Sequence, residues 1–187
     1  MAVTRADKVI TAEELLERYA AGGRDFSGVE IEASDELVGA NFAGINLSRS
    51  ILAEMILDRV NFSDANLRDT NFGQTSLDGA NLQRADLSGV NLAFGSFDNA
   101  DLTDAQLIEA YLESTDMWGV NFTRSNLTEA KIGDSHSFCN CIFSDTIMPN
   151  GDIAVDDSFE IGDSSYFVDC TFNNTFLTEA DIGIDDV

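Results

Sequence analysis

Basic residues are scarce in this sequence, which has 10 Lys and Arg against 34 Asp and Glu and a formal net charge of −24. No Lys or Arg follows Lys131. A chain this acidic repels nucleic acid and anionic membranes, and its electric field favours protein partners with basic surfaces. We therefore expect neither direct nucleic-acid binding nor membrane association.

Long apolar runs and cysteines are also few. No window approaches the ~18 apolar residues that are needed to cross a bilayer. Residues 1–21 carry scattered charges in place of the apolar core of a signal peptide. Three cysteines, an odd number without a secretory signal, favour a reducing cytoplasm over a disulfide framework. The sequence thus predicts a cytoplasmic protein, with a monomer favoured and the oligomeric state left open.

A five-residue repeat dominates the rest of the sequence. From Leu37 to Ile132 every fifth residue is a large hydrophobe, twenty in unbroken phase. The residue two positions before each of these hydrophobes is mostly Ala, Thr, Ser, Val or Gly. The residue directly before the hydrophobe is often Asn or Asp, as in Ala80-Asn81-Leu82. Apolar positions therefore recur at gaps of two and three, which fits neither an α-helix nor a plain β-strand.

This spacing predicts a chain that coils around its own core. A gap of two is one strand step, with both side chains facing the same way, and the extra residue in the gap of three is absorbed at a corner. Stacked coils would pair through backbone hydrogen bonds about 4.8 Å apart. We expect the Leu and Phe residues of the repeat to be buried and the Asn and Asp residues between the apolar positions to be exposed.

The repeat resembles that of the pentapeptide-repeat family, whose pattern is A(D/N)LXX. The resemblance covers residues 26–148 and returns at 165–182, and cyanobacterial members of the family are similar at residues 20–26 and 146–151. It implies a single all-β domain, a right-handed quadrilateral β-helix with four pentapeptides in each coil. Twenty unbroken repeats then imply five coils.

The two ends of the repeat differ from its middle. Residues 11–21 are predicted to form a short capping helix, because Thr11-Ala12-Glu13-Glu14 is a capping box and Gly22 suits the helix end. Such a helix would cover the open end of the first coil. At the other end the phase slips by one after Ile132. Residues 149–164 are expected to form an acidic loop and residues 165–182 a final partial coil.

Few residues are candidates for catalysis or metal binding. His136, the only histidine, lies at the phase slip without the nucleophile and acid that general base catalysis needs, so a corner or core role is favoured. His136, Cys139, Cys141 and Cys170 are zinc-ligand types without the spacing of a zinc site. Core packing is favoured for Cys141 and Cys170, with metal binding and a Cys141–Cys170 disulfide as alternatives. We expect no catalytic residue, no metal site and no cofactor.

A candidate partner-binding surface appears when residues twenty apart are placed in register. Three aspartates would then stack on one face, and like charges about 4.8 Å apart repel one another unless they are screened or used. Three aromatic residues take outward positions in the same region. They are interpreted either as anchors for a partner or as hydrophobic residues scattered over the surface. The candidate surface comprises Asp58, Asp78, Asp98, Phe94, Tyr111, Asp116 and Trp118.

The favoured function is a non-catalytic, acidic scaffold for protein–protein interaction, as the resemblance to regulatory cyanobacterial members implies. The alternative is a DNA mimic, because the family has a gyrase-directed branch, linked to quinolone resistance, that occupies the DNA-binding site of the enzyme. The net charge and the aspartate stack suit a mimic. Residues 183–187, however, offer no counterpart to the C-terminal module through which that branch dimerises.

Overall fold

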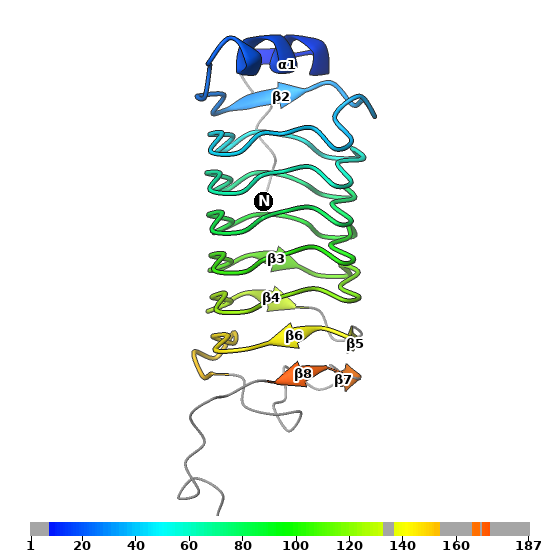
Figure 1. The fold of residues 1–187 in the computed structure, drawn as a ribbon, viewed down its shortest axis with the longest axis vertical. Helices are drawn as coiled ribbons and strands as arrows, with labels where there is room; N and C mark the ends of the chain where they lie inside the picture. Colours follow the sequence, from blue (N-terminus) through cyan, green and yellow to red (C-terminus); the bar gives the residue numbers. More distant parts are fainter. Residues whose placement is uncertain (1–7, 133–136, 154–165, 169, 173–187) are drawn as a thin grey trace, which may run out of the picture.

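The computed structural model of the protein describes residues 8–132, 137–153, 166–168 and 170–172. Over these residues the chain winds into a stack of coils beneath one short helix (Figure 1). Parallel β-bridges join residues twenty apart, as between Asn61, Asn81 and Asp101, so that each coil holds four pentapeptides. The longer pairings, all parallel, are β1 (Lys8–Ile10) with β2 (Val29–Ile31), β3 (Tyr111–Leu112) with β4 (Lys131–Ile132), β5 (Ser137–Cys139) with β7 (Tyr166–Val168), and β6 (Ile142–Phe143) with β8 (Thr171–Phe172).

The large inward residues stack in four columns, which we number as faces 1 to 4 in chain order. All of them are buried except Ile132, which is partly buried, and this confirms the burial predicted for the Leu and Phe residues of the repeat. The columns are Phe42, Phe62, Leu82, Leu102, Phe122 and Phe143 on face 1; Phe26, Leu47, Leu67, Leu87, Leu107, Leu127 and Met148 on face 2; Ile10, Ile31, Leu52, Phe72, Leu92, Leu112 and Ile132 on face 3; and Leu37, Leu57, Leu77, Phe97, Met117 and Phe138 on face 4.

The smaller inward position holds either an apolar residue or a buried hydroxyl. Thr70 Oγ1 donates to the carbonyl of Leu47 at 2.8 Å, and Thr75 Oγ1 to the carbonyl of Leu52 at 2.7 Å, in both cases in the coil above. A buried hydroxyl needs such a partner, because leaving it unpaired costs about 1–3 kcal/mol. Ser and Thr therefore fit inside the core without disturbing it.

Each corner is a four-residue turn whose third residue is left-handed. In the corner at residues 62–65, the Ala65 N–H donates to the Phe62 carbonyl at 3.1 Å and Asp64 has a φ of 60°. This conformation is unfavourable for residues other than glycine. Here the Asp64 N–H also donates to the Gln83 carbonyl of the next coil at 2.9 Å. Hydrogen bonds between coils thus stabilise the left-handed conformation at the corners, even where the residue is charged or aromatic.

The Asn and Asp residues before the core positions are mostly half-buried, which corrects the expectation that they are exposed. The Asn81 side-chain oxygen accepts the N–H of Gln83, two residues on, at 3.1 Å. Asn61 Nδ2 also donates to Asn41 Oδ1 in the coil above, at 2.9 Å. Short polar side chains of this kind are suited to closing turns. These residues are therefore part of the corner structure and not free surface groups.

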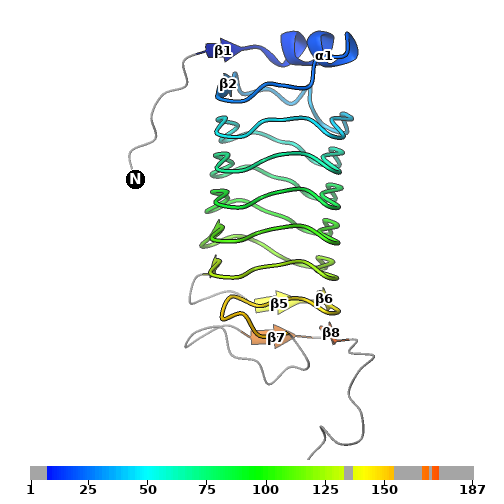
Figure 2. The same ribbon diagram turned by 90° about the vertical axis from the view of Figure 1, so that its left-hand side faces the viewer.

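The predicted N-terminal helix is present as α1 (Ala12–Ala20), which lies with β1 across the top of the stack (Figure 2). Thr11 Oγ1 accepts the Glu14 N–H at 3.1 Å, as expected for the N-cap. Leu15 is fully buried, whereas its neighbour Leu16 is exposed. Tyr19 donates its hydroxyl to the Ala43 carbonyl at 2.8 Å and thereby joins the helix to the coils. Among the described residues no helix is long and apolar enough to cross a membrane.

The phase slip after Ile132 is accommodated within the stack, because Trp118 pairs with Cys139, one residue further on than the usual twenty. The face 1 rings then continue downward, with 5.2 Å between the centroids of Phe122 and Phe143 and 5.4 Å from Phe143 to Phe172. Of the predicted loop 149–164 and partial coil 165–182, residues 149–153, 166–168 and 170–172 are described. Leu177 and Ile182, expected to continue the repeat, lie outside the described residues.

We expect Leu82→Ala to lower the free energy of unfolding by about 2–5 kcal/mol, because the closed coil cannot collapse around the missing atoms. Denaturant unfolding measures this change. Ile56→Ala is the control, since Ile56 is 50% exposed, and it should change stability by less than about 0.5 kcal/mol. Equal effects of the two substitutions would contradict the assignment of Leu82 to the core.

Deleting residues 1–24 should expose Phe26, Ile31 and Leu37 and open a strand edge, so we expect aggregation in sedimentation or light-scattering measurements. A milder test uses two adjacent residues of α1. Leu15→Asp should destabilise the protein strongly because Leu15 is buried, whereas Leu16→Asp should have little effect. A truncated protein as soluble as the parent would show that α1 does not act as a cap.

Candidate partner-binding surface

The three predicted aspartates stand in one column on face 4 and bond to the coil below. The Asp78 carboxylate accepts hydrogen bonds from the Ser96 hydroxyl and from the Asp98 N–H, the latter at 3.1 Å. The Asp98 carboxylate accepts the Trp118 N–H at 2.7 Å. Asp58 accepts the hydroxyl of Ser76 in the same way. The sequence analysis expected this stack to be repulsive unless it is screened or used, and these hydrogen bonds are a use of the aspartates inside the protein.

The reason for these bonds lies in the residues that precede the core positions on face 4. On the other faces an Asn or Asp there closes most turns, whereas face 4 has Ile56, Ser76, Ser96 and Asp116. Asp98 thus replaces the missing turn acceptor for the Trp118 N–H, while Asp78 shares the Asp98 N–H with Ser96 Oγ, which accepts it at 3.2 Å. Only the Oδ1 atoms of Asp78 and Asp98 make these bonds, and the described residues provide no hydrogen bond to either Oδ2. Each carboxylate thus has an oxygen left for another molecule.

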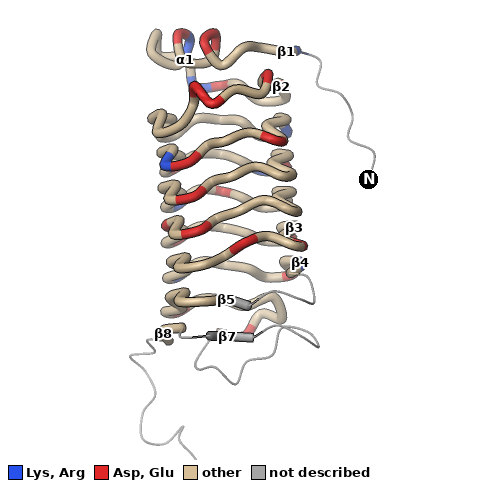
Figure 3. Tube along the Cα trace, turned by 90° about the vertical axis from the view of Figure 1, so that its right-hand side faces the viewer, with Lys and Arg blue, Asp and Glu red and all other residues tan. Residues whose placement is uncertain are grey.

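The acidic groups of face 4 form no ion pair with the basic residues that the structure describes. Figure 3 looks onto the side of the stack that carries β5 and β7, and acidic segments recur there on successive coils. Asp116 is exposed and pairs with Ser96 in the coil above, on the same face as the three aspartates. None of the ion pairs among the described residues includes Asp58, Asp78, Asp98 or Asp116.

The three predicted aromatic residues are exposed, but they do not share one face. Trp118 is 49% exposed and continues the aspartate column on face 4. Phe94 is 67% exposed at the corner where face 3 leads into face 4, with a φ of 60°. Tyr111 lies in β3 on face 3. Their exposure matches the prediction, while the structure separates Tyr111 from the other two.

Tyr111 already has a cationic neighbour. Lys131 Nζ donates to the Tyr111 hydroxyl at 3.0 Å and lies 4.4 Å from the centre of its ring. The parallel pairing of β3 with β4 places the two residues opposite each other. A cation over a ring attracts its π-electrons, so the last basic residue of the sequence is held at Tyr111.

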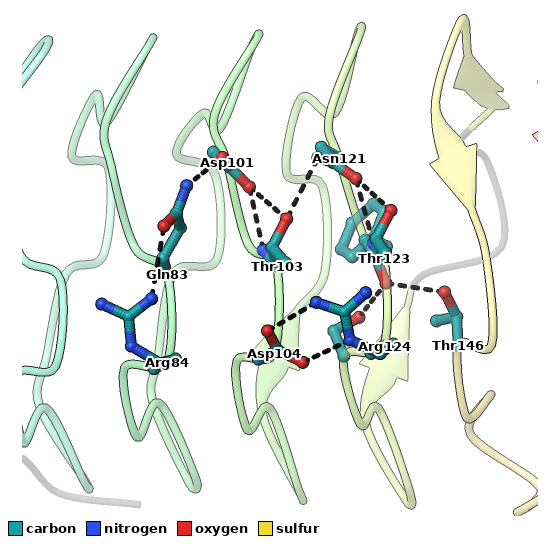
Figure 4. A network of polar contacts seen from close by, with 11 residues as sticks. Gln83, Arg84, Asp101, Thr103, Asp104, Asn121, Thr123, Arg124 and Thr146 are labelled. Carbon is teal, nitrogen blue, oxygen red and sulfur yellow. Dashed lines mark hydrogen bonds and ion pairs between the residues drawn. The ribbon is translucent and has the colours of Figure 1, made fainter.

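A ladder of alternating charge, which the sequence analysis missed, runs down the corner that follows face 1. Arg84 Nε and Nη2 donate to the two Asp64 oxygens at 2.7 and 2.8 Å. Arg124 binds Asp104 with the same geometry, and this second pair is drawn in Figure 4. The hydrogen bond from Arg84 lowers the pKa of Asp64, and that from Arg124 lowers the pKa of Asp104. The column contains Asp64, Arg84, Asp104, Arg124 and Asp145. Writing the sequence in rows of twenty residues would have revealed it.

A second polar network lies beside this ladder on face 1. Gln83 Nε2 donates to Asp101 Oδ2 at 2.6 Å, and Thr103 donates to Asp101 Oδ1 with its N–H and its hydroxyl (Figure 4). Burial opposes ionisation of Asp101, but the hydrogen bonds from Thr103 and Gln83 outweigh it and lower the pKa. The acids of face 1 are therefore satisfied within the protein.

Cys141 and Cys170 occupy inward positions, as the sequence analysis favoured. Cys141 is buried in the core and Cys170 packs partly buried against it, both as thiols. His136 lies outside the described residues. No group of three or more His, Cys, Asp or Glu side chains within the described part of the chain is arranged to hold a metal ion.

Comparison with solved structures finds several that are similar to this chain. A trypsin-treated form of QnrB1, a plasmid-mediated fluoroquinolone resistance protein, is 17% identical, with 80% of this chain and 77% of that chain covered and a TM-score of 0.44. Rfr23 from the cyanobacterium Cyanothece 51142 is 21% identical, with 73% and 86% covered and a TM-score of 0.33. HetL, involved in heterocyst differentiation regulation in Nostoc, is 20% identical, with 78% and 100% covered and a TM-score of 0.21. No curated protein matches the sequence.

The family assignment rests on the repeat itself. The family model for pentapeptide repeats (8 copies) matches residues 36–74, 65–104 and 105–145, which together make up more than half of the chain. These residues include the stacked coils described above and both columns of charge. The chain belongs to the pentapeptide-repeat family.

Proposed function

We propose that this protein is a non-catalytic scaffold whose acidic face binds a protein partner with a basic surface. The acidic face comprises Asp78, Asp98, Asp116 and Trp118 on face 4, with Phe94 at its edge. The observation that carries the proposal is that none of the ion pairs among the described residues includes these carboxylates, whereas the Asp64–Arg84 and Asp104–Arg124 pairs neutralise charge at the corner after face 1. A cationic partner would therefore be attracted to face 4.

The rigidity of the coils supports such a role. We infer that they form the right-handed, four-sided β-helix of the family, with neighbouring coils about 4.8 Å apart. Backbone bonds such as Gly79 N–H to the Asp98 carbonyl, at 2.7 Å, repeat from coil to coil and fix the backbone that carries each surface residue. Binding then orders few groups, which lowers its entropic cost. Trp118, half exposed beside the carboxylates, offers the large apolar contact that is typical of a binding hot spot.

A DNA mimic is the second hypothesis, and the aspartate column is the observation that favours it. Duplex DNA carries one negative charge per about 1.7 Å of its axis, whereas a column of aspartates provides one per coil, or about 4.8 Å. A mimic would need several such columns. Arg84 and Arg124 interrupt the acidic column at the corner of face 1, and Lys131 lies on face 3. This distribution suits one acidic contact face better than a rod that is negative on all sides.

We expect Trp118→Ala to weaken binding of the partner at least tenfold, because it removes the largest exposed side chain of the acidic face. The partner is first isolated with the full-length protein as bait, and its affinity is then measured by titration calorimetry at low and moderate salt. Ile153→Ala is the control, since Ile153 is 50% exposed but outside the acidic face. Unchanged affinity of the Trp118→Ala protein would contradict the scaffold proposal. Binding to gyrase that falls steeply with salt and is insensitive to Trp118→Ala would instead support the mimic.

Two substitutions at Asp78 separate its structural role from a binding role. Asp78→Asn keeps an oxygen that can accept the Asp98 N–H, so we expect unchanged stability and weaker binding of a basic partner. Asp78→Ala removes that acceptor and should lower the free energy of unfolding by about 1–3 kcal/mol. The triple Asn variant at Asp58, Asp78 and Asp98 should likewise be as stable as the parent or slightly more so. If Asp78→Asn bound the partner as tightly as the parent, the charge of this column would serve the fold alone.

A further inference from the structure

Two cysteines lie directly above one another at the lower end of the stack. The Thr171 N–H donates to the Cys141 carbonyl at 2.8 Å, and β8 pairs with β6 so that Thr171 lies opposite Ile142. Cys170, which precedes Thr171, is thereby placed opposite Cys141. Parallel neighbours in adjacent coils are about 4.8 Å apart, and disulfides join residues whose Cα atoms are about 4.4–6.8 Å apart. The backbone therefore already holds the two residues at bonding separation.

Both side chains also point the same way, into the core. Cys141 Sγ donates to the Met117 carbonyl at 2.9 Å and Cys170 Sγ to the Phe138 carbonyl at 3.1 Å, in each case in the coil above. A hydrogen bond with Cys170, together with burial, raises the pKa of the Cys141 thiol. Cys139 differs, because it pairs with Val168 below and Trp118 above, neither of which is a cysteine.

The geometry points to a redox modification site, in which Cys141 and Cys170 form a disulfide by exchange with a small-molecule disulfide. Cys170 is the more accessible of the two, so its thiolate attacks one sulfur of the small disulfide and releases a first thiol. The Cys141 thiolate then attacks the Cys170 sulfur of the mixed disulfide and releases a second thiol. The protein pair is oxidised by two electrons, the small disulfide is reduced, and the two cysteine protons pass to the released thiols.

Oxidation at this site would tie the last described strands to the coil above. β7 and β8 pair with β5 and β6 through short runs of two or three residues. A covalent bond between Cys141 and Cys170 restricts the unfolded chain over the segment that it closes, which stabilises the folded form. The redox state would thus set how firmly this end of the stack is held.

The test uses the full-length protein, reduced and then equilibrated with oxidised glutathione. We expect peptide mapping by mass spectrometry to show a Cys141–Cys170 disulfide, and the thermal unfolding midpoint to rise. Cys139→Ser is the matched control and should behave like the parent. Cys141→Ser and Cys170→Ser should fold, because Ser50 and Thr146 occupy the equivalent inward position with the same type of hydrogen bond, but should form no internal disulfide.

The pH dependence gives a second readout. Because the pKa of the Cys141 thiol is raised, conversion of the mixed disulfide to the internal one should quicken from neutral to alkaline pH. The inference is overturned if glutathione stops at the mixed disulfide in the parent, if Cys139 forms the bond, or if the parent keeps all its thiols free to alkylation. An unchanged unfolding midpoint after disulfide formation would overturn the proposed effect on the end of the stack.

Discussion

Parallel stacking at a spacing of twenty residues is the constraint on which the rest of this structure depends. It brings residues such as Asp64 and Arg84, far apart in the sequence, to neighbouring coils where they bond directly. Every surface position becomes a member of a column, and its neighbours are the residues twenty before and twenty after it. The same constraint places a hydrophobe at every fifth residue in one closed core. The chemistry of the surface is therefore decided column by column.

The aspartates show how strongly the column determines what a residue does. Asp101 closes a turn by accepting the Thr103 N–H, Asp104 binds Arg124 in the next coil, and Asp98 accepts the Trp118 N–H. The side chain is the same in each case, but the first serves its own turn, the second a neighbouring charge and the third the backbone of another coil. The net charge of −24 thus says little about function until each acid is assigned to its column.

The core, the repeat and the cap could be predicted from the sequence, because burial of Leu82 follows from the five-residue spacing and α1 follows from the capping box at Thr11. The exposure of the Asn and Asp residues was predicted wrongly, since periodicity shows which side a residue faces but not that Asn81 closes a turn. Pairing of Asp64 with Arg84 was missed because the comparison of residues twenty apart was made for acidic residues and not for the basic residues beside them. Phe94, Tyr111 and Trp118 were predicted to lie on one surface, but Tyr111 lies on a different face from Trp118. The repeat pattern shows that a residue points outward but does not distinguish one face from another.

A hydrogen bond between Asp98 and Trp118 links the charged and the aromatic residues of the acidic face. Because the Asp98 carboxylate holds the Trp118 N–H at 2.7 Å, the acid fixes the backbone that carries the aromatic side chain. Its second oxygen faces no donor among the described residues, so the group that positions Trp118 can also meet a cation of a partner. A carboxylate held in this way loses little conformational freedom on binding, unlike an unrestrained surface acid. The aspartate column can therefore stabilise the fold and bind a partner at the same time. Its hydrogen bonds within the fold favour binding, because they hold the carboxylates in place.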